Sequence, residues 1–181
     1  MGRLVFLGVV FAATLGAQDW GAEVEKMLHE FMACKSPIDD KSPCNVFVSR
    51  ALARVYGIHD FESANNGTGH LSANQIADKL AAPGSNWTKL GNAGDQAVLE
   101  QAQGYANLKK AVIAVYKGEG HGHVAIILPG KSVASSAWAL KVPNSASFPL
   151  DEPQKAYIGK PLSNAFGASK KSVVLIYGRN F

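Results

Sequence analysis

The order in which apolar patterns follow one another along the chain restricts its fold more than any other feature. Apolar residues recur with a helical period as far as Gly104, and continuous apolar runs typical of strands come after it. Helices that precede strands, instead of alternating with them, indicate an α+β fold in which N-terminal helices pack on an antiparallel β-sheet. We expect helices over residues 23–34, 43–56, 73–82 and 95–104, and strands over 111–116, 123–128, 133–140 and 172–178.

Short local signals mark where these helices begin and end. Ser42, which a proline follows, is a typical start, because a serine side chain caps free backbone N–H groups and proline fits the first helical position. Gly57 is typical of a helix end. Later helices are expected to begin at the capping box Ser72–Gln75 and at Asp95. The second helix then carries Cys44 at its start, on its apolar face.

Composition narrows the class of protein. The chain has 181 residues, 47% of them hydrophobic, and its 18 Lys+Arg against 14 Asp+Glu leave a net charge of +4. These values favour one globular domain and exclude a disordered chain. Two cysteines are too few for a disulfide scaffold or a cysteine-rich zinc site. The small, unclustered charge gives no reason to expect a nucleic-acid partner.

The amino terminus has the order of a secretory signal peptide. Arg3 is followed by the apolar stretch 4–13 and by small residues that end at Ala17. We expect residues 1–17 to be removed and residues 18–181 to form a single exported domain, secreted or periplasmic, with no stable membrane insertion after cleavage. The apolar stretch is shorter than the roughly 20 residues that span a membrane. A buried first helix and an uncleaved anchor are the alternatives.

The candidate chemistry lies in Cys44 and His123. A helix N-terminus lowers the pKa of a thiol, and the thiolate is the nucleophilic form. A histidine at the start of a strand can take the thiol proton and return it to a leaving amine, while free N–H groups of the first helical turn stabilise an oxyanion. The structural alternatives are a small core cysteine and a strand histidine with satisfied hydrogen bonds.

The segments SPCNVFV (42–48) and GHVAI (122–126) resemble motifs of the papain-like cell-wall peptidases. These comprise the NlpC-type and CHAP families and the amidase effectors of type VI secretion. The resemblance implies a papain-like fold and hydrolysis of amide bonds in peptidoglycan stem peptides, with Cys44 as nucleophile and His123 as base. No metal and no organic cofactor are implied. Peptidoglycan is the expected partner, and an inhibitor or immunity protein is a further candidate.

A third catalytic residue is less evident, because the polar residue that NlpC-type enzymes place on the following strand is not obvious here. A hairpin turn at Gly130 would pair His123 near Ala137, and strand alternation would then put Ser135 on the face of His123. Ser135 is therefore the candidate that orients the imidazole. The alternatives are Ser136 after a one-residue slip, the more distant Asn144, or a Cys–His dyad.

Other residues near these motifs have two interpretations each. His121 is expected beside the cleft, and with His123 it forms a metal-ligand pair that has no third ligand nearby, so no metal is expected. Trp138 is a candidate for the lining of a glycan cleft or for the core. A Cys34–Cys44 disulfide would block the nucleophile, either as a reversible redox lock or as a structural bridge that rules out the enzyme.

Two rival functions fit the same residues. A catalytically silent module would hold a cell-wall glycopeptide in the same cleft. An acyl transferase on the same fold would pass the acyl group from a thioester to an amine or alcohol instead of water.

Overall fold

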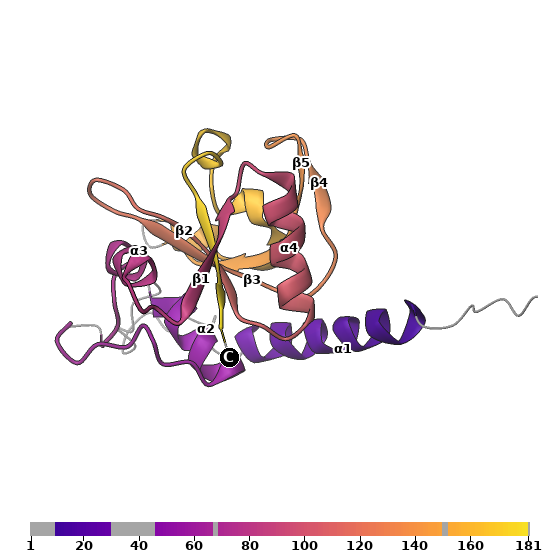
Figure 1. The fold of residues 1–181 in the computed structure, drawn as a ribbon, viewed down its shortest axis with the longest axis horizontal. Helices are drawn as coiled ribbons and strands as arrows, with labels where there is room; N and C mark the ends of the chain where they lie inside the picture. Colours follow the sequence, from indigo (N-terminus) through magenta and orange to yellow (C-terminus); the bar gives the residue numbers. More distant parts are fainter. Residues whose placement is uncertain (1–9, 30–45, 67–68, 150–151, 181) are drawn as a thin grey trace, which may run out of the picture.

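The computed structural model describes residues 10–29, 46–66, 69–149 and 152–180. Within them, four α-helices pack on a six-stranded antiparallel sheet, accompanied by a separate two-stranded sheet (Figure 1). This confirms the α+β fold with helices packed on an antiparallel sheet.

The helices are α1 (Val10–His29), α2 (Phe47–Tyr56), α3 (Ala73–Ala81) and α4 (Gln96–Asn107). The large sheet has the order β1-β8-β2-β3-β6-β7. Its strands are β1 (Trp87–Asn92), β2 (Val112–Tyr116), β3 (His123–Ile127), β6 (Asn144–Ser147), β7 (Tyr157–Pro161) and β8 (Leu175–Arg179). The small sheet pairs β4 (Val133–Ser135) with β5 (Leu140–Val142).

Local capping signals are confirmed. The Ser72 hydroxyl accepts from the Gln75 backbone N–H, and the Gln75 side chain accepts in return from the Ser72 backbone N–H, 2.9 Å away. Asp95 caps α4 by accepting from the N–H of Ala97 at 2.9 Å. Gly57 ends α2 in the left-handed conformation, with φ 65°. These signals are read reliably because each involves residues only a few positions apart.

The amino-terminal helix differs from the expectation. The helix predicted over 23–34 begins instead at Val10, ends at His29 and runs without interruption through Ala17. None of the described helices is long and apolar enough to cross a membrane. The predicted start of the second helix, with Ser42 and Cys44, lies outside the described residues, and α2 is seen from Phe47 onward.

The strand pairing after β3 also differs. The single strand predicted over 133–140 is wrong, because this segment forms the separate β4–β5 hairpin, and β3 pairs instead with β2 and β6. The turn at Gly130 is fixed by Asn107 of α4, whose Oδ1 accepts from the Gly130 N–H at 2.8 Å and whose Nδ2 donates to the Gly130 carbonyl at 3.1 Å. The chain is thereby tied to α4 rather than returned along β3.

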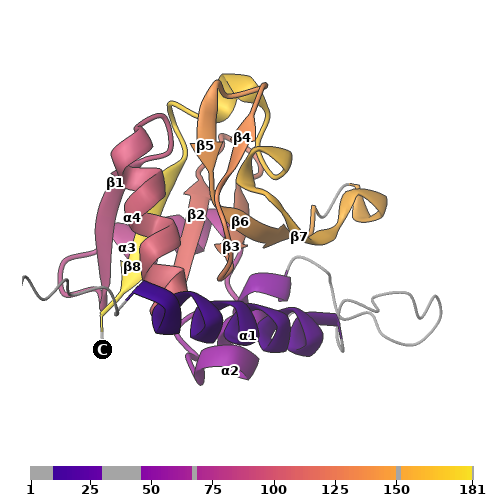
Figure 2. The ribbon, with the colours of Figure 1, turned by 90° about the vertical axis from the view of Figure 1, so that its right-hand side faces the viewer.

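The sheet separates two hydrophobic cores. On one face, the α2 side, alternate residues such as Ile113 and Ile126 pack with α1, α2 and α3. On the other face, the α4 side, residues such as Ala114 and Ile127 pack with α4 and with the chain around Trp138. Figure 2 shows α4 over the sheet and α1 alongside α2 at one end of it.

Candidate active site

A pocket of about 450 Å³ lies where the start of α2 meets the start of β3. Four segments that are distant in sequence form its wall: Phe47 and Val48 of α2, residues 72–74 at the start of α3, Tyr116 with residues 120–124, and the segment with Phe148, Pro149 and Glu152. The rings of Phe47 and Phe148 in this wall lie 6.1 Å apart. This volume falls within the range usual for small-molecule and cofactor sites.

One wall is a glycine-rich loop fastened to α3. The Asn74 side chain donates to the Gly118 carbonyl at 2.9 Å and accepts from the Gly118 N–H at 3.1 Å. Gly122 allows a close approach, since a Cβ there would overlap Asn74 Oδ1 and the Tyr116 carbonyl oxygen. Asn74 therefore sets the path by which the chain enters β3.

His123 is the first residue of β3 and is half-buried at the pocket. By strand alternation its side chain shares the face of Ala125 and Ile127, which is the α4 side. Its Nε2 lies 2.7 Å from the Oγ of Ser147, and its ring meets Phe166 edge-on at 5.2 Å. Burial lowers the pKa of His123 to about 4 from the usual 6.5, so the ring is neutral at pH 7.

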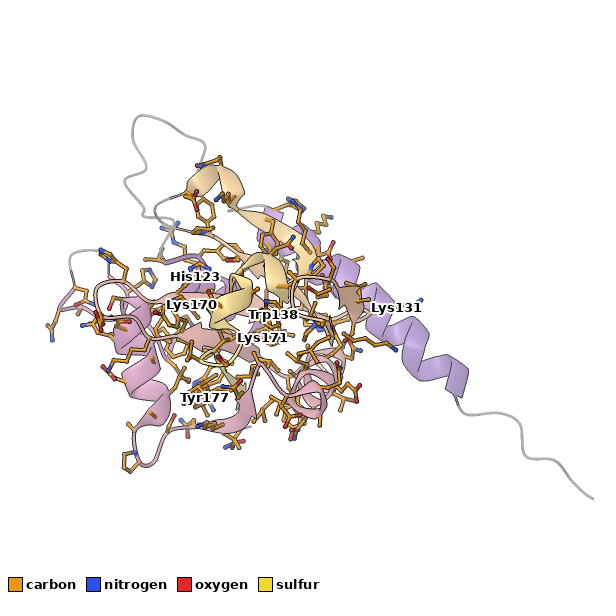
Figure 3. The ribbon with its side chains drawn as sticks, turned by 90° about the horizontal axis from the view of Figure 1, so that it is seen from above. His123, Lys131, Trp138, Lys170, Lys171 and Tyr177 are labelled. Atoms are coloured by element: carbon orange, nitrogen blue, oxygen red, sulfur yellow. The ribbon has the colours of Figure 1, made fainter. Side chains whose placement is uncertain are left out.

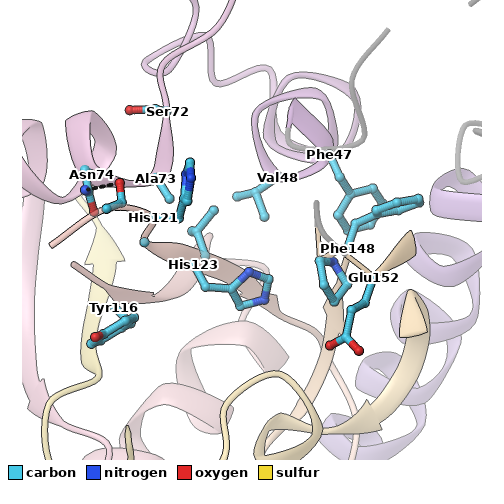
Figure 4. A pocket seen from close by; sticks show the side chains of 14 residues that line it. Phe47, Val48, Ser72, Ala73, Asn74, Tyr116, His121, His123, Phe148 and Glu152 are labelled. Atoms are coloured by element: carbon cyan, nitrogen blue, oxygen red, sulfur yellow. Dashed lines mark hydrogen bonds between the residues drawn. The ribbon is translucent and has the colours of Figure 1, made fainter. Parts of the chain in front are cut away.

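The two histidines of the motif point in different directions. Figure 4 shows His121 directed toward Ala73 of α3, and the ring of His123 directed away from α3, toward the side of Phe148 and Glu152. His121 is exposed, whereas His123 is held by Ser147. Both line the pocket, so a bound molecule would meet them from different sides.

The interpretation of Ser135 as the residue that orients His123 is corrected by the structure. Ser135 lies on β4, which pairs only with β5, and its hydroxyl donates to Ser163 Oγ at 2.9 Å and accepts from the Trp138 N–H at 3.3 Å. The predicted hairpin register had brought it to His123, and that register does not form. The alternative Asn144 donates to the Pro129 carbonyl at 2.9 Å and belongs to the loop support instead.

Trp138 is also corrected, since it lies in the core and cannot line a cleft. Its side chain is 0% exposed, and its indole N–H donates to the Phe166 carbonyl at 3.3 Å. Figure 3 shows Lys171 beside it, and the Lys171 ammonium donates to the Trp138 carbonyl at 2.8 Å.

The remaining predictions concern the two cysteines and a metal site. Cys44 and Cys34 lie outside the described residues, as does any bond between them. Within the described part of the chain, no three His, Cys, Asp or Glu side chains gather closely enough to hold a metal ion. Ser147, Asn74 and Glu152 were not predicted from the sequence. Asn74 lies within the capping box, between Ser72 and Gln75, which places it in the first turn of α3. Ser147 lies in a short polar segment without a strand signal.

Comparison with known proteins does not assign a family: no protein-family model matches the chain, and no curated protein matches it. The resemblance to papain-like peptidases therefore rests on the two short motifs around Cys44 and His123.

Proposed function

We propose that this protein is an exported cysteine hydrolase that cleaves amide bonds in peptidoglycan stem peptides, with Cys44 as nucleophile and His123 as general base. The observation that carries the proposal is the pocket, which has the first turn of α2 and His123 in its wall. Cys44 precedes Val46 by two residues, and two residues of chain span at most about 7 Å. The proposal therefore places the thiol beside that turn.

The helix end supplies the electrostatics of the reaction. Val46, the N-cap of α2, makes no side-chain hydrogen bond to the helix. In this proposal the backbone N–H groups of the first turn face the reacting carbonyl. These groups and the helix dipole favour a thiolate and an oxyanion at this end. A substrate carbonyl placed between Cys44 and the first turn would meet both.

The proton path follows from the roles of the two residues. The Cys44 thiol gives its proton to His123 as the sulfur bonds to the amide carbon, and His123 then protonates the leaving amine. Water resolves the thioester with His123 again as base, which releases the carboxylate and restores the thiol. His123 starts this cycle neutral, because burial holds its pKa near 4. No metal or organic cofactor takes part.

The compartment and partners belong to the same proposal. Removal of residues 1–17 would deliver the domain to the periplasm or the exterior, where peptidoglycan is the substrate. An inhibitor or immunity protein that covers the pocket is a further partner of this class. The silent wall-binding module and the acyl transferase remain the competing functions.

Mass spectrometry of muropeptides tests these options together. Purified residues 18–181 should release stem-peptide fragments that have gained one water, and Cys44→Ala should release none while remaining folded by circular dichroism. Cys34→Ala is the matched control and should keep the activity. Fragments joined to an added amine would indicate the transferase, and binding to peptidoglycan without fragments would indicate the silent module. Cleavage by folded Cys44→Ala would exclude the mechanism.

A further inference from the structure

Ser147 has an unusual position for a serine, because it is completely buried and yet reaches the pocket histidine. It ends β6 and is 0% exposed. Ser147 pairs directly with Ala125 on β3, and His123 lies two residues before Ala125 on the same face. Such diagonal neighbours lie about 7–8 Å apart at their Cα atoms, a gap that a histidine side chain can span. The resulting Nε2–Oγ distance is 2.7 Å.

The imidazole is therefore held at two places. Ser147 engages Nε2, and Phe166 packs edge-on against the ring, with an interplanar angle of 69°. Among the described residues, Nδ1 of His123 has no hydrogen-bond partner. Of the two ring nitrogens, Nδ1 is thus the one that the described residues leave without a hydrogen bond.

We propose that Ser147 is the positioning residue of this site: its Oγ accepts the Nε2–H of His123 and so keeps Nδ1 as the nitrogen that exchanges the proton of the reaction. The inference rests on the proposed function. On attack, the thiol proton moves to Nδ1 while Nε2–H stays on Ser147. Nδ1 later gives that proton to the leaving amine. Ser147 itself neither gains nor loses a proton.

A hydroxyl in this role differs from a carboxylate because it brings no charge. Ser147 and Phe166, which both contact the His123 ring, are neutral. The other ionisable side chains in the pocket wall are Tyr116, His121 and Glu152, and Glu152 is paired with Lys155 at 2.6 Å. Among the described residues, no partner charge offsets the burial of His123, in keeping with its lowered pKa.

The first test reads the ring directly and needs no turnover. The ¹⁵N chemical shifts of His123, assigned by comparison with His123→Gln, should show a protonated Nε2 and an unprotonated Nδ1 at pH 7. Ser147→Ala should lower the pKa of His123 further, because an acceptor for Nε2–H stabilises the charged ring. A protonated Nδ1, or a pKa that rises in Ser147→Ala, would mean that Ser147 donates to Nε2 and would overturn the proposal.

The second test compares two serines on one strand. Ser145 is as buried as Ser147 but bonds Tyr157 Oη and the Lys160 carbonyl, each at 2.9 Å. Ser147→Ala should lower kcat/KM by roughly tenfold, the equivalent of one lost hydrogen bond. Ser145→Ala should leave kcat/KM within about twofold, even where it lowers stability, and Ser147→Thr should restore most of the rate.

The outcomes separate this inference from the proposed function. Equal losses in Ser145→Ala and Ser147→Ala would show a merely structural effect and would overturn the positioning role. An inactive wild-type protein whose His123 shows the expected tautomer and the expected pKa change would refute the hydrolase and keep the Ser147 contact. If Ser147→Ala does not fold, the tautomer of His123 in the wild-type protein and the rate of Ser147→Thr still test the positioning role.

Discussion

The two sides of the sheet are filled in different ways. The α2 side is closed by apolar side chains, and Ser49 is its one buried polar side chain among the described residues. The α4 side holds the other four, Gln103, Ser135, Ser145 and Ser147, and each of them has a hydrogen-bond partner.

This difference shows how the α4 side can carry a titratable residue. At the end of β3 and at the start of β6, buried backbone groups have side-chain partners. Gln103 donates to the Leu128 carbonyl at 2.9 Å and accepts from the Asn144 N–H at 2.8 Å. His123 lies at the open end of this polar layer, where Ser147 bonds it and the pocket begins. The α2 side contributes the apolar wall and the helix end.

The largest expected effect distinguishes the two histidines. His123→Ala should lower turnover on peptidoglycan by about 10²–10⁴-fold, the usual contribution of a general base. His121→Ala should lower it by less than tenfold, because His121 is exposed and points toward α3. Released muropeptides measured against time provide the comparison. A larger loss of turnover in His121→Ala than in His123→Ala would identify His121, which points toward the α2 side, as the base.

Truncation of the core should destabilise both sides. Trp138→Ala, on the α4 side, should lower the free energy of unfolding by about 4 kcal/mol, and Leu52→Ala, on the α2 side, by about 3 kcal/mol. The tryptophan change should cost more because it also leaves the Phe166 carbonyl without its donor. Urea unfolding measures both. A stable Trp138→Ala protein with weakened peptidoglycan binding would return Trp138 to the cleft.

Acid should lower the stability of the folded protein through His123, on the α4 side. The pKa of His123 is about 4 in the folded protein, where the ring is buried. In the unfolded chain, where the ring is exposed to water, its pKa is the usual 6.5. The unfolded chain therefore binds the proton first, and stability falls as the pH drops from 6.5 toward 4. The loss from this group is at most about 3 kcal/mol, reduced by its partial exposure.

His123→Gln should remove this part of the pH dependence, and His121→Gln should retain it. His70, whose pKa is lowered by burial and by Arg50, contributes equally in both variants. Urea unfolding at pH 7 and pH 4.5 measures the difference. Identical pH dependence in the two variants would contradict a buried, neutral His123.

The smallest effects compare a long-range polar contact with a local one. Gln103→Met should cost about 2 kcal/mol, because it leaves the Leu128 carbonyl and the Asn144 N–H buried without partners. Ser72→Ala removes only the cap of α3 and should cost about 1 kcal/mol. Thermal and urea unfolding rank the two. If Ser72→Ala lost more unfolding free energy than Gln103→Met, the long-range contacts of Gln103 would not stabilise the protein more than the local cap does.

Features that depend on residues close together in the sequence could be predicted from it. The cap of α3 and the glycine that ends α2 follow from residues a few positions apart, and β2 and β3 follow from apolar runs. β6 escaped prediction because its sequence, NSAS, has small polar residues with weak strand preference. Ser147 was not predicted for the same reason. Ser135 was predicted instead because the chain was expected to return along β3, whereas Asn107, 23 residues before Gly130, binds the turn to α4.

The rate at which iodoacetamide alkylates Cys44 across pH tests the central claim, that Cys44 and His123 act as a pair, most directly. Cys34→Ser leaves Cys44 as the only thiol, since the chain has two cysteines. In this background, Cys44 should react faster at pH 6–7 than a free thiol does, His123→Gln should lower that rate at least tenfold, and His121→Gln should leave it nearly unchanged. A rate that His123→Gln does not alter, in a folded protein, would contradict the pair.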